Sequence, residues 1–259
     1  MPVPDALLIV PFLFGAVVGS FLNVCICRLP EGVSVVFPPS RCPACGAGIP
    51  FYYNIPILGW FILRGRSACC GAPLSFKYPL IEAVTAVFAV LLAVRFGYGA
   101  ELFVYFTFVS ALIVVTFIDL KHQIIPDVIS LPGIAVGLIL SWVMPVGIVD
   151  ALIGVAIGGG ILFGIAAAYL LLTGQDGMGG GDIKLLAMIG AFLGWKGVIV
   201  TLLLGSFLGA ATGVIFMVFA GKGAKFPIPF GPFLAAGALA YLFFGEELIN
   251  WYIIRAVGP

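Results

Sequence analysis

The chain has 259 residues, of which 63% are hydrophobic and only 9% are charged, and its mean hydropathy is +1.25. Soluble domains are about 45–50% apolar and about 25% charged, so this composition excludes an ordinary water-soluble protein and indicates one that resides in a lipid bilayer. Twelve Lys and Arg against eleven Asp and Glu give a net charge of +1. Without a basic field we expect no nucleic-acid partner.

Apolar runs bounded by charged residues, Gly or Pro predict an all-α polytopic membrane protein with about eight transmembrane helices. The predicted spans are 6–27, 79–96, 102–118, 128–144, 149–172, 183–194, 198–219 and 228–245. The first run lacks the basic segment of a signal peptide, so we interpret it as a retained helix. Glycines four residues apart within several spans, such as Gly154 and Gly158, predict close packing of helices.

Basic residues fall unevenly between alternate connections, nine on one side and three on the other. The more basic side is expected to be cytoplasmic. The connection from Arg28 to Tyr78 lies on that side and is the one long polar stretch of the chain. We therefore predict three parts: a first transmembrane helix at 1–27, a cytoplasmic cysteine-containing loop subdomain at 28–78, and a multi-helix membrane domain at 79–259.

The loop subdomain carries four of the six cysteines, Cys42 and Cys45 in a C-P-A-C pair and the adjacent Cys69 and Cys70. Two thiolate pairs at this separation can close a tetrahedral zinc site, and a reducing cytosol favours metal over disulfide. An adjacent pair does not readily form the turn that C-x-x-C makes, and Ser67 stands where the first Cys of such a motif would be. Zinc ligation and free thiols therefore both remain open.

Two aspartates lie where predicted spans end, Asp119 in FIDLKHQIIPD and Asp182 in GMGGGDIKLLA. Acidic residues at this depth are costly and so suggest function. Two carboxylates in a partly dry site do not both ionise readily, so one keeps a proton while the other activates water for attack on an amide. Glycines 179–181 would let an extended substrate approach. The structural alternative is that each Asp only terminates a helix.

Several blocks in the chain resemble the bacterial type IV prepilin leader peptidases, which are membrane aspartic proteases with a G-x-G-D motif. The blocks are GSFLNVCICRLP at 19–30, CPAC with NIPILGWFILRGR within 42–66, YPLIE at 78–82, FIDLKHQIIPD at 117–127, GMGGGDIKLLA at 177–187 and IPFGPFLAAG at 228–237. They cover nearly the full chain in the same order.

The resemblance implies an enzyme of the bacterial inner membrane that cleaves the basic leader of type IV prepilins and pseudopilins after its Gly, at the cytoplasmic face. It implies N-methylation of the new N-terminal residue, often Phe, from S-adenosylmethionine. It makes 79–259 the aspartic peptidase domain, with Asp119 and Asp182 as catalytic residues, and places Glu82 near the methyl-transfer region. A helix N-terminal role for Glu82 stays open. Only Cys42, Cys45 and Cys70 match the family's two C-x-x-C pairs, with Cys69 as an offset substitute.

Alternative functions are a polytopic transporter or proton channel that uses the two Asp as relay groups, and a protein that keeps only the methyltransferase chemistry. Relay groups usually lie near the membrane midplane, whereas these two are predicted at span ends. Asp127, after Pro126, is predicted to cap a helix, and His122, the one His, to lie in a loop. Chain direction places Asp119 at a helix C-terminus and Asp182 at a helix N-terminus, which predicts Asp182 as the general base.

Overall fold

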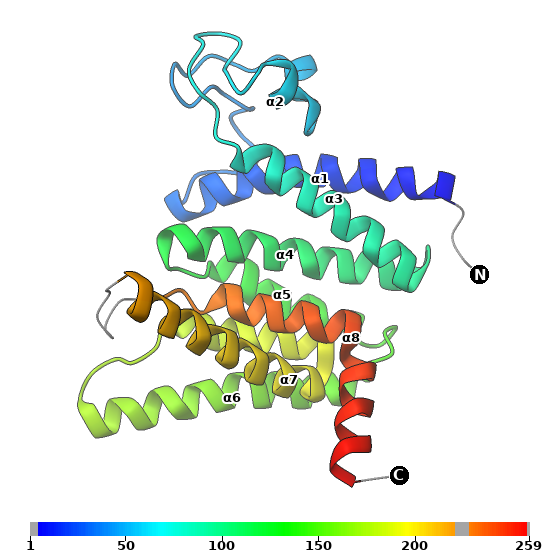
Figure 1. Cartoon of the computed structure of the whole chain (residues 1–259), viewed down its shortest axis with the longest axis vertical. Helices are drawn as coiled ribbons and strands as arrows, with labels where there is room; N and C mark the ends of the chain where they lie inside the picture. The colour runs from blue at the N-terminus through cyan, green and yellow to red at the C-terminus, as the bar shows by residue number, and fades with distance from the viewer. Residues whose placement is uncertain (1–4, 221–227, 258–259) are drawn as a thin grey trace. The chain divides into compact units, whose positions relative to one another are not determined.

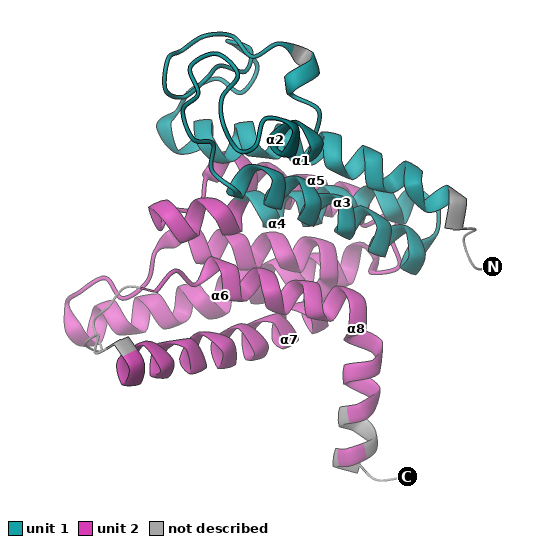
Figure 2. Ribbon diagram, turned by 45° about the horizontal axis from the view of Figure 1, so that its top comes forward, with its two compact units in different colours: residues 1–114 teal, residues 115–259 magenta. Residues whose placement is uncertain are grey.

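A computed structural model of the chain describes residues 5–220 and 228–257, and most of these residues are in α-helices (Figure 1). Extended pairing in the described residues is limited to two isolated bridges in the cysteine-containing loop. The predicted all-α class is therefore confirmed. The chain divides into two compact units, residues 1–114 and 115–259 (Figure 2).

Unit 1 is built on two long helices, α1 (Ile9–Arg28) and α3 (Lys77–Phe96). They pack closely because α1 presents glycines to α3: a Cβ on Gly15 or Gly19 would lie 2.7 Å from the Cα of Ala86 or Glu82. The other elements of the unit are the short helix α2 (Leu58–Ile62), the 3₁₀ segments Asp5–Leu8, Leu29–Glu31 and Phe51–Tyr53, and most of α4 (Ala100–His122).

Unit 2 starts within α4 and contains the elements α5 (Asp127–Leu140), α6 (Gly147–Thr173), α7 (Gly180–Ala220) and α8 (Gly231–Val257). Helices α6 and α7 touch backbone to backbone, since a Cβ on Gly158 would lie 2.9 Å from the carbonyl carbon of Leu186. The predicted role of the paired glycines in helix packing is thus met at Gly15, Gly19 and Gly158, whereas Gly160 and Gly164 face open space.

Six helices in the described residues are long and apolar enough to cross a membrane. All eight predicted spans are helical over most of their length, but two features lower the count. The spans predicted at 183–194 and 198–219 form the single element α7, interrupted at Gly194, where φ is 70° and ψ is −179°. The span predicted at 128–144 is α5, whose 14 residues reach only about 21 Å, short of the roughly 30 Å hydrocarbon core.

The contact between α6 and α7 gives a first prediction. A Cβ on Gly190 would collide with the backbone of Gly154 and lie 2.9 Å from the amide nitrogen of Val155. Gly190→Ala should therefore lower the free energy of unfolding by about 1–3 kcal/mol. Gly164→Ala is the control, because nothing lies within 4 Å of its Cβ position; it should stabilise by up to about 1 kcal/mol. Thermal unfolding in detergent tests this, and equal effects of the two variants would contradict the packing argument.

Candidate functional site

Asp119 lies in the last turn of α4 and is 5% exposed. Its carboxylate oxygen Oδ2 accepts a hydrogen bond of 2.9 Å from the backbone N–H of Gly231, the first residue of α8. The N–H groups in the first turn of a helix have no partner inside the helix, so this one is available to a carboxylate. The bond joins residues 112 positions apart in the chain.

Asp182 is the third residue of α7 and is half-buried. It lies close enough to Asp119 for the two carboxylates to repel each other electrostatically. The glycine before it, Gly181, packs against Ile125, whose Cβ would lie 2.9 Å from an added Cβ. Nothing lies within 4 Å of such an atom at Gly179 or Gly180. Unit 2 thus brings the two aspartates together beside a glycine segment with open space.

Asp127 forms an ion pair with Lys184, whose Nζ lies 2.7 and 2.8 Å from the two carboxylate oxygens. The predicted capping role of Asp127 is wrong, because Pro126 holds the cap position of α5 and the cap has no side-chain hydrogen bond. Asp127 instead links the start of α5 to the first turns of α7, next to Asp182. His122 is exposed at the end of α4 rather than in a loop.

Residues 41–48 and 66–73 of unit 1 form two turns of the same design. In each, the first thiol or hydroxyl residue, Cys42 or Ser67, donates its N–H to the carbonyl five residues later at 2.8 Å. The same residue accepts an N–H from the glycine four residues later, at 2.9 and 2.8 Å. That glycine has a positive φ of 72° in the first turn and 69° in the second. The second turn therefore forms despite its adjacent cysteines, with Ser67 in the position of Cys42.

The thiols of Cys42, Cys45, Cys69 and Cys70 converge, with all four sulfur atoms within 4.8 Å of one another. Cys69, two residues after Ser67, supplies the fourth sulfur. Its Sγ lies 3.1 Å from that of Cys45. The Ser67 hydroxyl donates to Cys42 Sγ at 3.2 Å. This bond and neighbouring backbone N–H groups lower the pKa of Cys42 to about 6. Four convergent sulfurs, one favoured as thiolate, fit the donor set of a structural zinc site.

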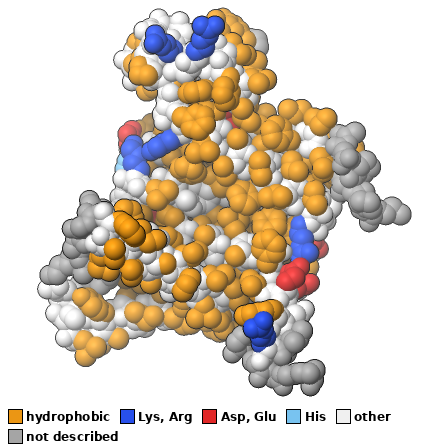
Figure 3. Space-filling model, viewed as in Figure 1, with side chains coloured by type: hydrophobic (Ala, Val, Ile, Leu, Met, Phe, Trp, Pro, Cys, Tyr) orange, Lys and Arg blue, Asp and Glu red, His pale blue; other side chains and the backbone are white. Residues whose placement is uncertain are grey.

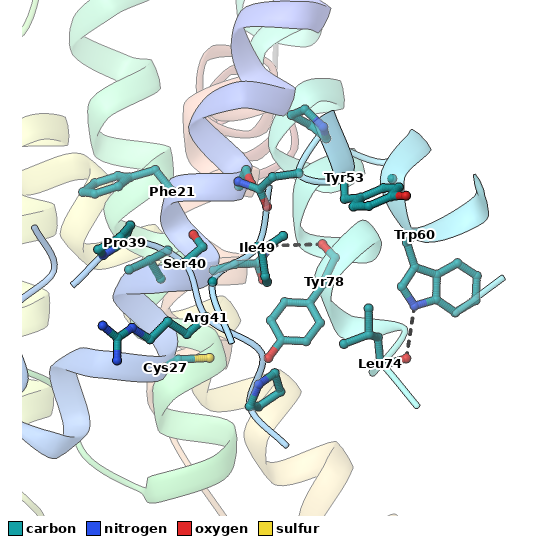
Figure 4. A pocket seen from close by; sticks show the side chains of 18 of the residues that line it. Phe21, Cys27, Pro39, Ser40, Arg41, Ile49, Tyr53, Trp60, Leu74 and Tyr78 are labelled. Carbon is teal, nitrogen blue, oxygen red and sulfur yellow. Dashed lines mark hydrogen bonds between the residues drawn. The ribbon is translucent and has the colours of Figure 1, made fainter. Parts of the chain in front are cut away.

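A cavity of about 690 Å³ opens in unit 1 between α1, the start of α3 and the loop that carries the cysteines (Figure 4). Its wall combines aromatic rings, among them Tyr53 and Trp60, with the polar side chains of Asn23, Arg41 and Glu82. Trp60 donates its ring N–H to the carbonyl of Leu74 at 3.1 Å. The size and the mostly apolar wall are those of small-molecule and cofactor pockets.

Glu82 lies on this cavity wall and is 8% exposed. It is the sixth residue of α3, beyond the first turn, so the helix N-terminal role is not supported. Its Oε2 accepts the N–H of Ile57 at 2.6 Å. Ile57 has φ 64° and ψ −58°, and the next N–H, that of Leu58, bonds to the carbonyl of Pro56 at 2.6 Å. This is a γ-turn of the strained kind, which a branched residue rarely adopts.

Two family models and several characterised proteins match the chain. Residues 13–96 match the bacterial peptidase A24 N-terminal domain, and residues 106–214 match the type IV leader peptidase family. The chain is 39% identical to the prepilin leader peptidase/N-methyltransferase of Aeromonas hydrophila, over 93% of this chain and 92% of that protein. It is 34% identical to the protein of that name from Pseudomonas aeruginosa, over 96% and 94%.

The chain belongs to the type IV leader peptidase family. The resemblance found in the sequence is thereby confirmed, and the transporter and proton-channel alternative is unsupported. No solved structure matches the chain.

Two features of this leader peptidase could not be read from motif residues alone. Gly231 lies in the quoted block IPFGPFLAAG, but nothing in its sequence context shows that its N–H reaches Asp119. Ile57 follows Pro56 in NIPILGW, and its positive φ contradicts the preference of a branched residue. The one usable signal for the contact of Gly231 was its position between Pro229 and Pro232, at the start of the span predicted at 228–245.

The ion pair between Asp127 and Lys184 gives a prediction for the peptidase. Both side chains are substantially exposed, at 56% and 36%, so a double-mutant cycle of Asp127→Asn and Lys184→Gln should give a coupling energy of about 0.2–1 kcal/mol. Leader cleavage should stay within several-fold of wild type, because neither residue is one of the paired carboxylates. Unfolding midpoints and cleavage rates of the four proteins decide this, and loss of cleavage in Asp127→Asn would show a chemical role.

Proposed function

We propose that this protein cleaves type IV prepilins after the leader Gly with Asp119 and Asp182 and then N-methylates the new N-terminus. The observation that carries the proposal is the placement of two interacting carboxylates at helix ends in unit 2, one buried and one half-buried. The relatives' shared name, prepilin leader peptidase/N-methyltransferase, supports both activities.

The site is proposed to face the cytoplasm of a bacterial inner membrane. Unit 1 carries exposed Lys and Arg on the part of the chain that holds the cysteines (Figure 3), and this basic side is expected to be cytoplasmic. The end of α4 and the start of α7 carry the two carboxylates. A prepilin with a soluble basic leader and an apolar mature segment would meet the carboxylates at the membrane boundary. Pseudopilins share this design and are included among the substrates.

Replacing either aspartate tests the peptidase function. Asp119→Ala and Asp182→Ala should each lower the rate of leader cleavage by at least 10²–10⁴-fold, since general acid–base catalysis contributes that much. Both variants should remain folded in detergent. Asp150→Asn, half-buried in the first turn of α6, is the control and should cleave normally. Near-normal processing of a purified prepilin by either Ala variant would exclude the aspartic mechanism.

Zinc is proposed as the structural metal of the four-thiol cluster, held by Cys42, Cys45, Cys69 and Cys70. When bound, it would cross-link the two turns and fix the loop that forms one wall of the cavity. The two turns are equivalent except that the second presents its sulfur from Cys69 instead of position 67. Moving the thiol from position 69 to position 67 therefore tests whether Cys69 is a zinc ligand.

Metal analysis of the purified protein should find about one zinc per chain. Cys69→Ala should lose most of it, and adding Ser67→Cys should restore it, because position 67 is the counterpart of Cys42. Cys25→Ala, a buried cysteine of α1 outside the cluster, is the control and should keep its zinc. If Cys69→Ala retains full zinc, the offset thiol is not a ligand.

The cavity in unit 1 is proposed to hold S-adenosylmethionine, which when bound supplies the methyl group. The cavity offers aromatic rings that can stack on an adenine and contact a sulfonium cation. Glu82 contributes by holding the Ile57 turn that forms part of the wall. Its carboxylate is already engaged by that N–H, so a neutral acceptor of the same shape should serve nearly as well.

Glu82 substitutions separate these roles. Glu82→Ala should reduce N-methylation strongly, because the Ile57 turn loses its anchor, whereas Glu82→Gln should retain most of the activity. Cleavage should persist in both variants. Mass spectrometry of the processed prepilin N-terminus measures both reactions, with Glu31→Gln, an exposed residue, as the control. Failure of Glu82→Gln to methylate would show that the negative charge itself is required.

A further inference from the structure

We infer that the backbone N–H of Gly231 fixes Asp119 as the carboxylate that activates water, which leaves Asp182 as the proton donor. Gly231 is then a positioning residue of the peptidase. The inference rests on the proposed peptidase function and assigns different roles to the two aspartates. It reverses the assignment expected from the direction of α4 and α7 alone.

The backbone of α8 donates a hydrogen bond to Asp119. The N–H of Gly231 contacts Oδ2 at 2.9 Å, so this oxygen accepts the bond, and its negative charge in the ionised form makes it the better acceptor. Bonds from backbone N–H groups to an ionised carboxylate are stronger than bonds between neutral groups. Asp119 is 5% exposed, so a charge there needs such a donor to offset the loss of water.

Asp119 lies where one helix ends and another starts. Asp119 is in the last turn of α4, where the carbonyl end of the helix disfavours an anion. It is also at the first N–H of α8, a helix of 27 residues whose amino end favours an anion. Phe230 is in the cap position before α8, because its carbonyl accepts the N–H groups of Phe233 and Leu234 at 3.0 and 3.1 Å. The N–H of Gly231 therefore has no hydrogen-bond acceptor within α8.

The contact between Gly231 and Asp119 requires a glycine at position 231. A Cβ on Gly231 would lie 2.7 Å from Asp119 Oδ2 and 3.3 Å from its Cγ. The same Cβ would lie 3.4 Å from Cδ1 of Ile125, and a Cβ on Gly181 would lie 2.9 Å from Cβ of Ile125. Ile125 thus packs against the glycine beside each aspartate. Any side chain at position 231 would therefore displace the carboxylate of Asp119 from the N–H.

The proton inventory of the reaction then follows. A water oxygen attacks the scissile carbonyl carbon, one water proton moves to the free oxygen of Asp119, and the carbonyl oxygen takes the proton of Asp182. The resulting gem-diol collapses with cleavage of the C–N bond. The leaving amine takes the proton from Asp119, and a diol hydroxyl returns its proton to Asp182. Products and both carboxyl groups end in their starting protonation states.

The hydrogen bond can be observed directly. The chain has five Phe–Gly pairs, so full-length protein with ¹³C-carbonyl Phe and ¹⁵N-Gly in detergent gives few amide signals. The Gly231 signal is the one that Phe230→Leu removes. We expect Asp119→Asn to shift this signal more than any other of the five, and more than Asp182→Asn does. No shift in Asp119→Asn would overturn the inference.

Kinetics test the roles. Gly231→Ala should lower kcat for a prepilin substrate at least tenfold with KM within about twofold, while Gly209→Ala should match wild type. Gly209 is the control because its Cβ would make an ordinary contact of 3.5 Å with Phe233. Asp182→Asn keeps a side-chain N–H that can polarise the carbonyl, so its residual cleavage should exceed that of Asp119→Asn at least tenfold.

The outcomes separate two failures. Normal cleavage by either Asp119→Asn or Asp182→Asn would sink the proposed peptidase site. Two other results would overturn only the assignment of roles, provided that both variants lose cleavage. One is a wild-type kcat for Gly231→Ala, and the other is more residual cleavage by Asp119→Asn than by Asp182→Asn. The aspartic mechanism would then stay in place.

Discussion

The arrangement of unit 2 depends on stabilising one buried carboxylate at the end of an apolar helix. Asp119 is 5% exposed in a chain with 9% charged residues, and its one described hydrogen-bond donor is the N–H of Gly231. To bring that N–H to Asp119, α8 must start beside the end of α4. Ile125 packs against both Gly181 and Gly231. The start of α7 therefore lies beside the start of α8, close to Asp119.

In unit 1, a polar loop is attached to the tightly packed pair of helices α1 and α3. The loop between α1 and α3 contains the two equivalent turns at 41–48 and 66–73, and Ile57 lies between them in sequence. Glu82 holds Ile57 from α3, the helix whose backbone touches α1 at Gly19. One buried carboxylate therefore connects the helix pair, the cavity wall and the loop of the thiol cluster.

The sequence was sufficient for features that depend on composition, periodicity or short motifs. It predicted the helices, the family and the four cysteines as a group, because apolar runs and motif spacing carry that information. It also placed the end of one span at 194, which is where α7 is interrupted at Gly194. It did not predict that a Cβ at this position would meet Val146 and Asp150, because those contacts join segments more than 40 residues apart in the chain. Nor did it predict the partner of Asp127, because Lys184 is 57 residues away.

The choice of Asp119 or Asp182 as the general base also depends on a contact between residues far apart in the chain. From chain direction alone, Asp182 at a helix start was the better anion and Asp119 at a helix end the worse one. That reasoning considered only the helix to which each residue belongs. The hydrogen bond from Gly231 adds the amino end of α8, 112 residues away, to the field at Asp119. A dipole argument restricted to one helix is incomplete wherever a second helix starts at the same point, and the two considerations give opposite assignments of the base.

The unequal environments of the two aspartates also suit a substrate that enters from one side. Asp182 is half-buried and follows Gly179 and Gly180, which have open space where side chains would be. An extended peptide can approach there and place its carbonyl near a carboxyl group that has no competing backbone donor among its described contacts. Asp119 is engaged at Oδ2 by its bond to α8. Backbone thus holds one carboxylate, while glycines leave open space beside the other, and under the proposed roles this would divide water activation from substrate contact before any peptide binds.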